Sequence, residues 1–384
     1  MSVTTAQGFL AGGIHCGIRK ARPDLAIVRS TRPANGAAMF TANRVKAAPV
    51  VISQEHLQLA QPQAVVINSG VANAATGLRG ELDARATAAE AARLLALDTE
   101  QVLVLSTGVI GSRLPLANVL PGLADAASAL SAEGGPQAAA AIMTTDTRPK
   151  QAQAKGPGFT VGGMAKGSGM IHPNLATMLA VVTTDYTLEP GEALEFLRPA
   201  VADSFNSISV DGECSTNDTV VLLANGASHA ERDDEAFAEA LAAVCGSLAK
   251  QIVADGEGAT YLAEVEVAGA ASEAEARAIA GRIATSPLVK TALHGRDANW
   301  GRILAAAGSA PFNGGYAQLD PDRTTLTMNG VPVFAAGSPQ AAEPTLDGER
   351  CRIELELGLG AGRASYLTTD LSHEYVAINA EYRS

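Results

Sequence analysis

AVVIN at positions 64–68 and VLVLS at positions 102–106 decide the fold class of this chain of 384 residues. Each run is short, rich in Val, Leu and Ile, and followed or closed by polar residues, which is typical of a buried strand. The segment between them, Leu82–Leu97, is rich in Ala and Leu and favours a helix. Strand, helix and strand in succession predict an α/β (α+β) architecture with large sheets.

Further periodic segments extend this prediction along the chain. Apolar residues recur at helical spacing from Phe237 to Ile252, which predicts an amphipathic helix. Ser272 followed by Glu275 is typical of a helix N-terminus. The segments 264–267 and 352–357 alternate polar and apolar residues, as half-exposed antiparallel strands do. We therefore expect a larger core domain over residues 1–258 and a smaller α+β domain over residues 259–384.

Composition and charge exclude several classes of protein. The 28 Lys and Arg against 40 Asp and Glu give a net charge of −12, which argues against a nucleic-acid or anionic-membrane partner. The four Cys show no CxxC spacing and the six His no HExxH, so we expect no metal site. No charged leader opens the chain, and no apolar run reaches the roughly 18 residues of a membrane span. These features predict a soluble, cytoplasmic protein.

The most unusual segment is Lys166–Leu179, KGSGMIHPNLATML. It lacks the GxxxxGK[ST] spacing of a phosphate-binding loop and the GxSxG spacing of a nucleophile elbow. The simplest interpretation is a flexible turn with a solvated lysine. The alternative is a threonine nucleophile at Thr177, with the threonine's own α-amine as the base. That amine becomes free only if the chain breaks between Ala176 and Thr177, through attack of the Thr177 hydroxyl on the Ala176 carbonyl.

Four other polar segments follow predicted strands and helices. Ser106–Gly111 is either a strand-to-turn connection or an oxyanion hole built from backbone N–H groups and a hydroxyl. The segments 143–147 and 211–218 are polar loops. In the loop 255–260, Glu257 is either a solvated carboxylate or a partner for an ammonium group. By charge type alone, Glu257 and Lys166 are suited to the two charged ends of an amino acid.

Taken together, these segments resemble the ornithine acetyltransferases of arginine biosynthesis, also called bifunctional glutamate N-acetyltransferases. The loop 166–179 is the strongest match, and the resemblance covers almost the whole chain. The other matching blocks are 39–50, 67–74, 106–111, 143–146, 204–206, 210–212, 215–219, 255–259, 286–292, 299–302 and 379–382. Any one block is a weak signal, whereas so many in the right order make a chance match very improbable.

The resemblance implies a layered sheet-and-helix sandwich and self-cleavage into an alpha chain, 1–176, and a beta chain from Thr177. It implies that Thr177 takes the acetyl group of N2-acetylornithine and passes it to glutamate, by a ping-pong mechanism and without metal or organic cofactor. The implied site residues are Thr107 and Gly108 for the oxyanion hole, and Thr144 or Thr145, Lys166, Thr177, Glu257, Asn379 and Ser384 for substrate. The chain departs from the family pattern at Val71 and at its end, Arg383-Ser384.

The resemblance also implies a heterotetramer with two copies of each processed chain. Acetyl-CoA remains open as a second acetyl donor. The sequence also allows two other enzyme functions, an amidohydrolase with the same threonine nucleophile and an acyltransferase of specialised metabolism. A third alternative is not an enzyme but a non-catalytic amino-acid-binding protein.

Overall fold

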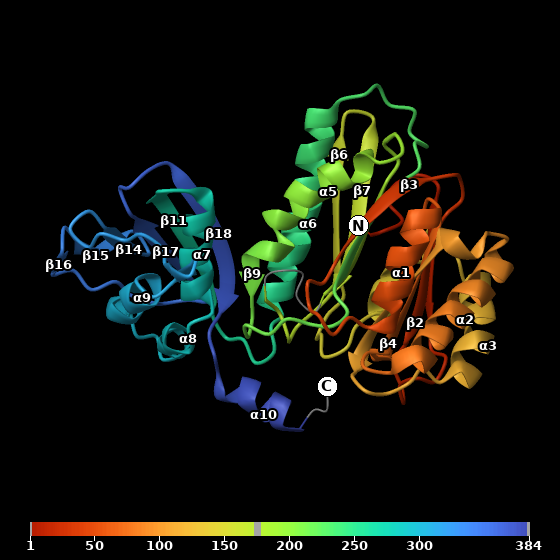
Figure 1. Ribbon diagram of the computed structural model, residues 1–384, viewed down its shortest axis with the longest axis horizontal. Helices are drawn as coiled ribbons and strands as arrows, with labels where there is room; N and C mark the ends of the chain where they lie inside the picture. Colours follow the sequence, from red (N-terminus) through yellow and green to blue (C-terminus); the bar gives the residue numbers. More distant parts are fainter. Residues whose placement is uncertain (1, 173–177, 382–384) are drawn as a thin grey trace.

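The computed structural model describes residues 2–172 and 178–381, and two β-sheets packed face to face form its larger lobe, the core lobe (Figure 1). The first sheet has the order β1-β2-β4-β5 and comprises β1 (Phe9–Ile14), β2 (Leu25–Ser30), β4 (Ala64–Val71) and β5 (Val102–Val109). The strands predicted at 64–68 and 102–106 are thus confirmed as parts of β4 and β5, which pair in parallel.

The second sheet has the order β3-β10-β8-β7-β6. Its strands are β3 (Asn35–Phe40), β10 (Thr219–Ala224), β8 (Leu179–Thr184), β7 (Phe159–Lys166) and β6 (Lys150–Gly156). Small aliphatic side chains of both sheets, such as Val28 and Ile67 of the first and Val181 and Val221 of the second, fill one shared core. This core explains how a chain with only 4% aromatic residues packs two large sheets.

Helices cover the outer face of each sheet and complete a four-layered α/β sandwich (Figure 1). The first sheet is covered by α1 (Ala48–Leu59), α2 (Gly77–Leu95) and α3 (Leu116–Ser128), and the second by α5 (Glu192–Ala202) and α6 (Asp234–Ala254). The short α4 (Gly135–Ala141) contributes to the core between the sheets. The helix predicted at 82–97 is α2, which begins earlier and ends where Ala96 adopts a left-handed backbone conformation.

Helix α6 is long and apolar. Among the described helices it has the length and apolar composition of a membrane span, although charged residues such as Glu239 and Lys250 interrupt its apolar residues. Half of its most apolar window is buried. The buried side chains, from Phe237 to Val253, pack on β6, β7 and α5 as those of a core helix do.

The C-terminal lobe is built on a third sheet with its own hydrophobic core. Its order is β16-β15-β14-β17-β11-β18-β9. The strands are β16 (Ser338–Pro339), β15 (Val331–Ala335), β14 (Thr325–Met328), β17 (Arg350–Glu356), β11 (Leu262–Ala270), β18 (Gly362–Thr369) and β9 (Ile208–Ser209). Helices α7 (Glu273–Ala284), α8 (Pro287–His294) and α9 (Trp300–Ala307) contribute to that core, and β12 (Pro311–Phe312) and β13 (Gly315–Tyr316) form a separate hairpin.

The expected antiparallel character of this sheet is only partly correct. β11 pairs with β18 in the antiparallel sense, but with β17 in the parallel sense. Alternation of polar and apolar residues reports that one face is buried, and it carries no information about strand direction. Ser272 does cap α7, because its hydroxyl accepts a hydrogen bond from the Glu275 amide.

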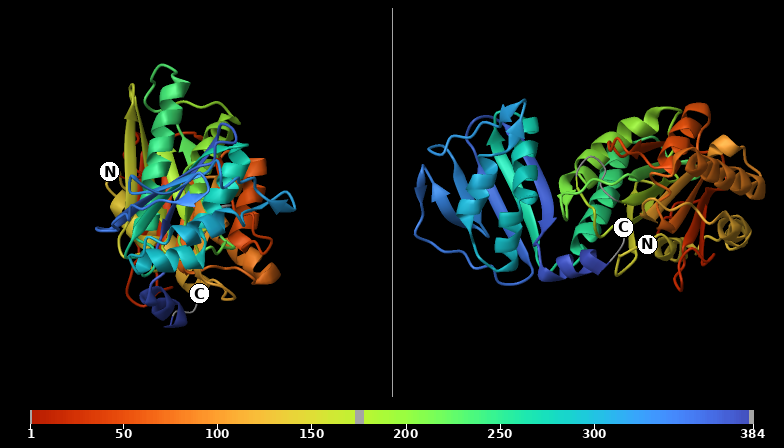
Figure 2. Two further views of the ribbon diagram at one scale, coloured as in Figure 1. Left: turned by 90° about the vertical axis from the view of Figure 1, so that its left-hand side faces the viewer. Right: turned by 60° about the horizontal axis from the view of Figure 1, so that its bottom comes forward.

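Two elements cross the predicted boundary at residue 258, which itself stays a prediction. β9 comes from the core part of the chain but pairs with β18 of the C-terminal lobe. Helix α10 (His373–Glu381) leaves the C-terminal lobe after β18 and extends back toward the core lobe (Figure 2). Helix α10 therefore reaches the region where β5, β7 and the end of α6 meet.

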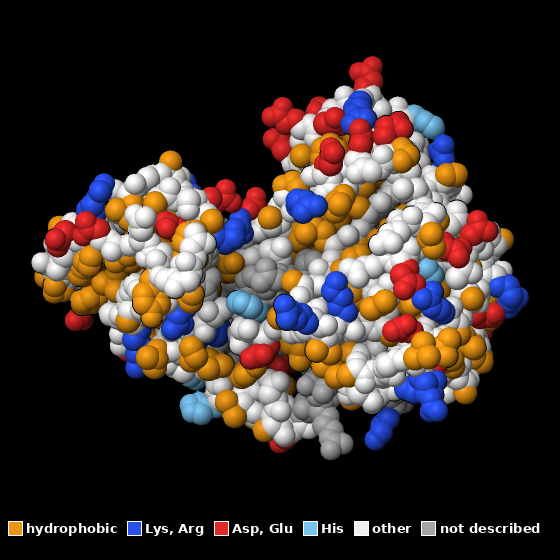
Figure 3. Space-filling model, in the orientation of Figure 1, with side chains coloured by type: hydrophobic (Ala, Val, Ile, Leu, Met, Phe, Trp, Pro, Cys, Tyr) orange, Lys and Arg blue, Asp and Glu red, His pale blue; other side chains and the backbone are white. Residues whose placement is uncertain are grey.

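On the face shown in Figure 3, Lys and Arg side chains lie scattered among acidic and apolar ones rather than gathered in one broad basic area. The same view shows the surface hollowed between the two lobes.

Candidate active site

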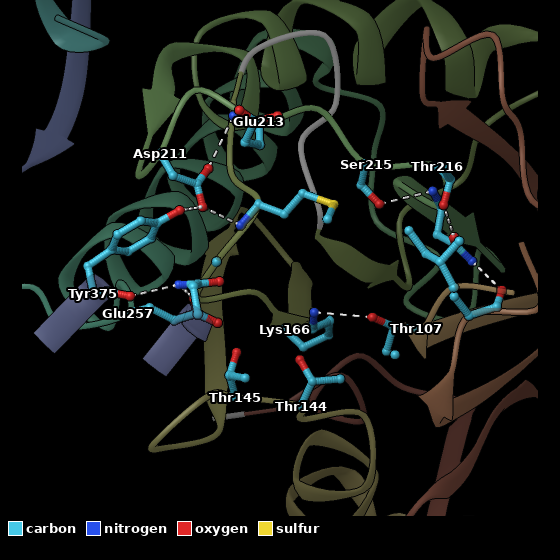
Figure 4. Close-up of a pocket in the computed structure, with 17 residues that line it drawn as sticks. Thr107, Thr144, Thr145, Lys166, Asp211, Glu213, Ser215, Thr216, Glu257 and Tyr375 are labelled. Carbon is cyan, nitrogen blue, oxygen red and sulfur yellow. Dashed lines mark hydrogen bonds between the residues drawn. The ribbon is translucent and has the colours of Figure 1, made fainter. Parts of the chain in front are cut away.

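A cavity of about 690 Å³, open solvent at its mouth included, collects most of the residues that the sequence pointed to (Figure 4). Seven predicted residues line it: Thr107, Gly108, Thr144, Thr145, Lys166, Glu257 and Asn379. The remaining lining residues are Ala72, Ile110, Gly169, Met170, Asp211, Glu213, Ser215, Thr216, Asn217 and Tyr375. Three predicted positions, Ala176, Thr177 and Ser384, lie outside the described residues.

Lys166 is the buried cation of this cavity. It ends β7, it is 2% exposed, and its Nζ donates a hydrogen bond to Thr107 Oγ1 over 3.2 Å. The interpretation of this residue as a solvated lysine on a flexible turn was therefore wrong. Burial lowers the pKa of Lys166, and the attraction of Asp146 opposes that shift.

A buried ion-pair network lies next to Lys166. Lys150 Nζ contacts Asp146 Oδ1 at 2.6 Å and Asp255 Oδ2 at 2.5 Å, and Asp146 Oδ1 also accepts the Gly167 amide at 2.7 Å. Burial alone would raise the pKa of Asp146, but Lys166 and Lys150 outweigh burial and bring that pKa to about 2. The sequence showed Asp146 only as part of a polar run and gave no sign of Lys150. Their ion pair depends on tertiary contacts, which sequence patterns do not reveal.

Thr107 and Gly108 lie near the end of β5, as an oxyanion hole on a strand end requires. Gly108 has φ +133°, and a Cβ there would lie 2.2 Å from the Gly70 carbonyl carbon, so only glycine fits. Asn217 fixes this region from the neighbouring loop, since its Nδ2 donates to the carbonyl oxygens of Ser106 at 2.8 Å and Ala72 at 2.7 Å. The sequence placed Asn217 in a polar loop and did not reveal this positioning role.

The two candidate threonines differ in their partners. The Thr144 amide donates to Asp146 Oδ2 at 2.9 Å, and its hydroxyl lies 3.5 Å from the same oxygen. The Thr145 side chain makes no hydrogen bond to the part of the chain that the structure describes. Both side chains line the cavity (Figure 4).

Carboxylates gather on the opposite side of the cavity from the Lys166–Thr107 pair (Figure 4). Asp211 accepts hydrogen bonds from the amides of Met170 at 2.5 Å, Ile171 at 2.8 Å and Glu213 at 3.2 Å, and from the Tyr375 hydroxyl at 3.3 Å. Burial raises the pKa of Asp211, against the effect of these amides. Tyr375 comes from α10 and was not foreseen, because nothing in its sequence context links it to the loop 211–218.

Glu257 and Asn379 meet at the same side. Asn379 of α10 donates through Nδ2 to Glu257 Oε2 at 2.8 Å. Gly169 leaves room for the carboxylate, because a Cβ at that position would lie 2.3 Å from the Glu257 carboxyl carbon. Glu257 is thus half-buried and directed at the cavity rather than fully solvated.

Asp218 is a further buried carboxyl that the sequence did not single out. Its Oδ1 accepts the amide of Met178, the residue directly after the predicted nucleophile, at 3.1 Å. Its Oδ2 has no hydrogen-bond partner in the described part of the chain. Burial raises the pKa of Asp218 well above the ordinary range, although Met178 and Lys166 oppose that shift.

These contacts suit a zwitterionic or acylated amino acid, because one cavity offers a buried ammonium, free carboxylate oxygens and hydroxyl and amide donors beside them. Within residues 2–172 and 178–381, no group of three or more His, Cys, Asp or Glu is placed to hold a metal ion.

Comparison with known proteins identifies the family of the chain. The model of the ArgJ family matches residues 10–384. Proteins named arginine biosynthesis bifunctional protein ArgJ are 50% identical in Mycolicibacterium paratuberculosis, over 100% of this chain and 96% of that protein, and 45% identical in Streptomyces coelicolor, over 100% of both. A solved ornithine acetyltransferase from Mycobacterium tuberculosis, complexed with ornithine, is 42% identical over 45% of this chain and 94% of its own, with a TM-score of 0.42.

The resemblance drawn from the sequence motifs is therefore confirmed over nearly the whole chain. The chain is an enzyme and belongs to the ArgJ family, whose relatives named above are bifunctional proteins of arginine biosynthesis.

Proposed function

We propose that this enzyme transfers the acetyl group of N2-acetylornithine to glutamate, giving ornithine and N-acetylglutamate. The observation that carries the proposal is the meeting of buried Lys166 and the Glu257 carboxylate in one cavity with Thr107 and Gly108. An ammonium and a carboxylate match the charged groups of an amino acid, and the strand-end donors match the oxygen of an acyl group under attack. Membership of the ArgJ family supports the same pathway.

The proposed reaction begins with self-cleavage between Ala176 and Thr177. The Thr177 hydroxyl oxygen attacks the Ala176 carbonyl carbon, the C–N bond breaks, and the hydroxyl proton passes to the departing nitrogen. Water then hydrolyses the resulting ester, leaving a carboxylate on Ala176 and a free amine on Thr177. An α-amine ordinarily has a pKa of roughly 7.7–8.0, which suits a base at neutral pH.

Acetyl transfer then follows a double displacement. The Thr177 oxygen forms a bond to the acetyl carbon of N2-acetylornithine, the amide C–N bond breaks, and ornithine leaves with the proton. Thr107 and Gly108 stabilise the oxyanion of each tetrahedral intermediate, and Lys166 binds the substrate carboxylate. The glutamate amine next attacks the acetyl ester and restores the Thr177 hydroxyl.

This chemistry needs no metal or organic cofactor, because the chain itself supplies nucleophile, base and oxyanion donors. Acetyl-CoA as a second donor fits the word bifunctional in the names of the relatives. The cytoplasmic location and the heterotetramer of two alpha and two beta chains belong to the same proposal. Asn379 and Ser384 complete the substrate contacts in it.

Initial-rate kinetics test the proposal against hydrolysis by the same nucleophile. Varying N-acetylornithine at several glutamate concentrations gives parallel double-reciprocal lines for a double displacement. Ornithine release without glutamate then stops after one turnover. Continuous acetate release without glutamate supports an amidohydrolase, and binding without any product supports an amino-acid-binding protein.

Denaturing electrophoresis tests the cleavage. The active wild-type protein resolves into two chains, and Thr177→Ala leaves one intact, inactive chain. An active protein that runs as a single full-length chain refutes the processing step.

A further inference from the structure

We propose that Glu213 selects the acetyl donor, by receiving the side-chain ammonium group of N-acetylornithine. This inference rests on the proposed function and adds to it a specificity-determining residue that neither the motifs nor the comparisons assign.

The first support is the uneven charge of the cavity lining. Among its described lining residues Lys166 is the sole cation, and it lies beside Thr107. Three carboxylates, Asp211, Glu213 and Glu257, line the same cavity, with Asp211 and Glu257 on the side opposite Lys166 (Figure 4). A substrate with a carboxylate at one end and an ammonium at the other is attracted to both sides.

The second support is that these three carboxylates differ in the number of hydrogen bonds they already accept. Asp211 already accepts three backbone amides and the Tyr375 hydroxyl, so its oxygens are engaged in holding the loop. Glu257 has one oxygen occupied by Asn379. The Glu213 carboxylate makes no hydrogen bond or ion pair with any described residue, although its backbone amide is anchored on Asp211 at 3.2 Å. The backbone of Glu213 is thus anchored, and its exposed carboxylate lines the cavity without a partner among the described residues.

The chemistry of the two substrates makes such a charge selective. Donor and acceptor share an α-carboxylate and an α-nitrogen, and they differ in charge at the end of the side chain. N-acetylornithine carries an ammonium there, whereas glutamate carries a carboxylate. A free carboxylate on Glu213 attracts the first and repels the second, so it favours the donor on the unacetylated enzyme and limits unproductive binding of glutamate.

Matched substrates test this without relying on a variant. N-acetylnorvaline has the same carbon chain as N-acetylornithine but lacks the side-chain amine. With saturating glutamate, we expect the wild-type kcat/KM to favour N-acetylornithine by about tenfold or more, as a charge-assisted hydrogen bond provides. Glu213→Gln is expected to lower this ratio several-fold by raising KM for N-acetylornithine, with kcat retained and KM for glutamate equal or lower. Glu257, which lines the same cavity, accounts for the preference that remains.

Glu133→Gln is the matched control, because Glu133 is an exposed carboxylate in the connection between α3 and α4 and does not line the cavity. It is expected to leave the ratio unchanged. Equal use of both donors by the wild type, or an unchanged preference in Glu213→Gln, overturns the role of Glu213. Absence of any transfer from N-acetylornithine in the wild type refutes the proposed function itself, which distinguishes the two failures.

Discussion

Substitution of Gly169 by Ala is expected to move the Glu257 carboxylate without removing its charge. The new Cβ would lie 2.3 Å from the Glu257 carboxyl carbon and Oε2, whereas ordinary contacts begin at 3.4 Å. The carboxylate must therefore retreat by the difference between 3.4 and 2.3 Å, about 1 Å. The Glu257 amide is held on the Ser168 carbonyl oxygen at 2.9 Å, so the side chain moves and its hydrogen bond from Asn379 breaks.

The expected effect is large on activity and small on stability. A shift of about 1 Å in a substrate-positioning group lowers kcat/KM for N-acetylornithine by roughly ten- to a hundredfold. The free energy of unfolding changes by less than about 1 kcal/mol, because the displaced atoms end a flexible side chain and the φ of Gly169 lies outside the left-handed region.

Initial rates of ornithine release and urea unfolding measure the two effects. Gly246→Ala in α6 is the control, because a Cβ there meets no atom within 4 Å. It should keep full activity and gain up to about 1 kcal/mol, as alanine does over glycine inside a helix. An activity for Gly169→Ala within twofold of the wild type would refute the role of Glu257, and unfolding of this variant would refute the packing argument.

Three further predictions concern neighbouring residues. Thr107→Val should lower kcat by about 10²–10³-fold, because the oxyanion hole loses a hydrogen-bond donor. A change in kcat of less than twofold would show that the Thr107 hydroxyl is not such a donor. Thr145→Val should raise KM for the donor several-fold more than Thr144→Val, because Thr144 is engaged with Asp146; equal KM values for both variants contradict this. Asp146 has a pKa of about 2 in the folded protein, against an ordinary value of 3.8. This difference stabilises the folded state by about 2 kcal/mol. The stabilisation is present above pH 3.8 and is lost as the pH falls from 3.8 through 2. Urea unfolding between about pH 5 and pH 2 should show that the free energy of unfolding falls more steeply in the wild type than in Asp146→Asn. Equal pH dependence in both proteins would refute the contribution of Asp146.

Local sequence patterns predicted the elements that local forces determine. The strands β4 and β5 and the helices α2, α6 and α7 are confirmed because their apolar periodicity and caps lie within each segment. The parallel pairing of β11 with β17 was missed, since strand direction depends on the path of the intervening chain.

The site shows the same limit. Residue types and motifs identified Lys166 and Glu257, but burial of Lys166 was missed because it depends on partners far away in sequence, such as Thr107. Asp218 and Tyr375 were missed for the same reason, since one reaches Met178 and the other Asp211 only through the tertiary fold. Gly108 had a role assigned by resemblance, and its positive φ now gives a steric reason for glycine there.

Intact-protein mass spectrometry during turnover tests the central claim most directly. With N-acetylornithine and no glutamate, the account predicts two chains divided between Ala176 and Thr177, with one acetyl group on Thr177 of the second chain. Glutamate should then remove that group and yield one equivalent of N-acetylglutamate. An unmodified Thr177 chain before glutamate is added, from enzyme that forms N-acetylglutamate once it is added, would contradict the account, and so would an acetyl group on any other residue.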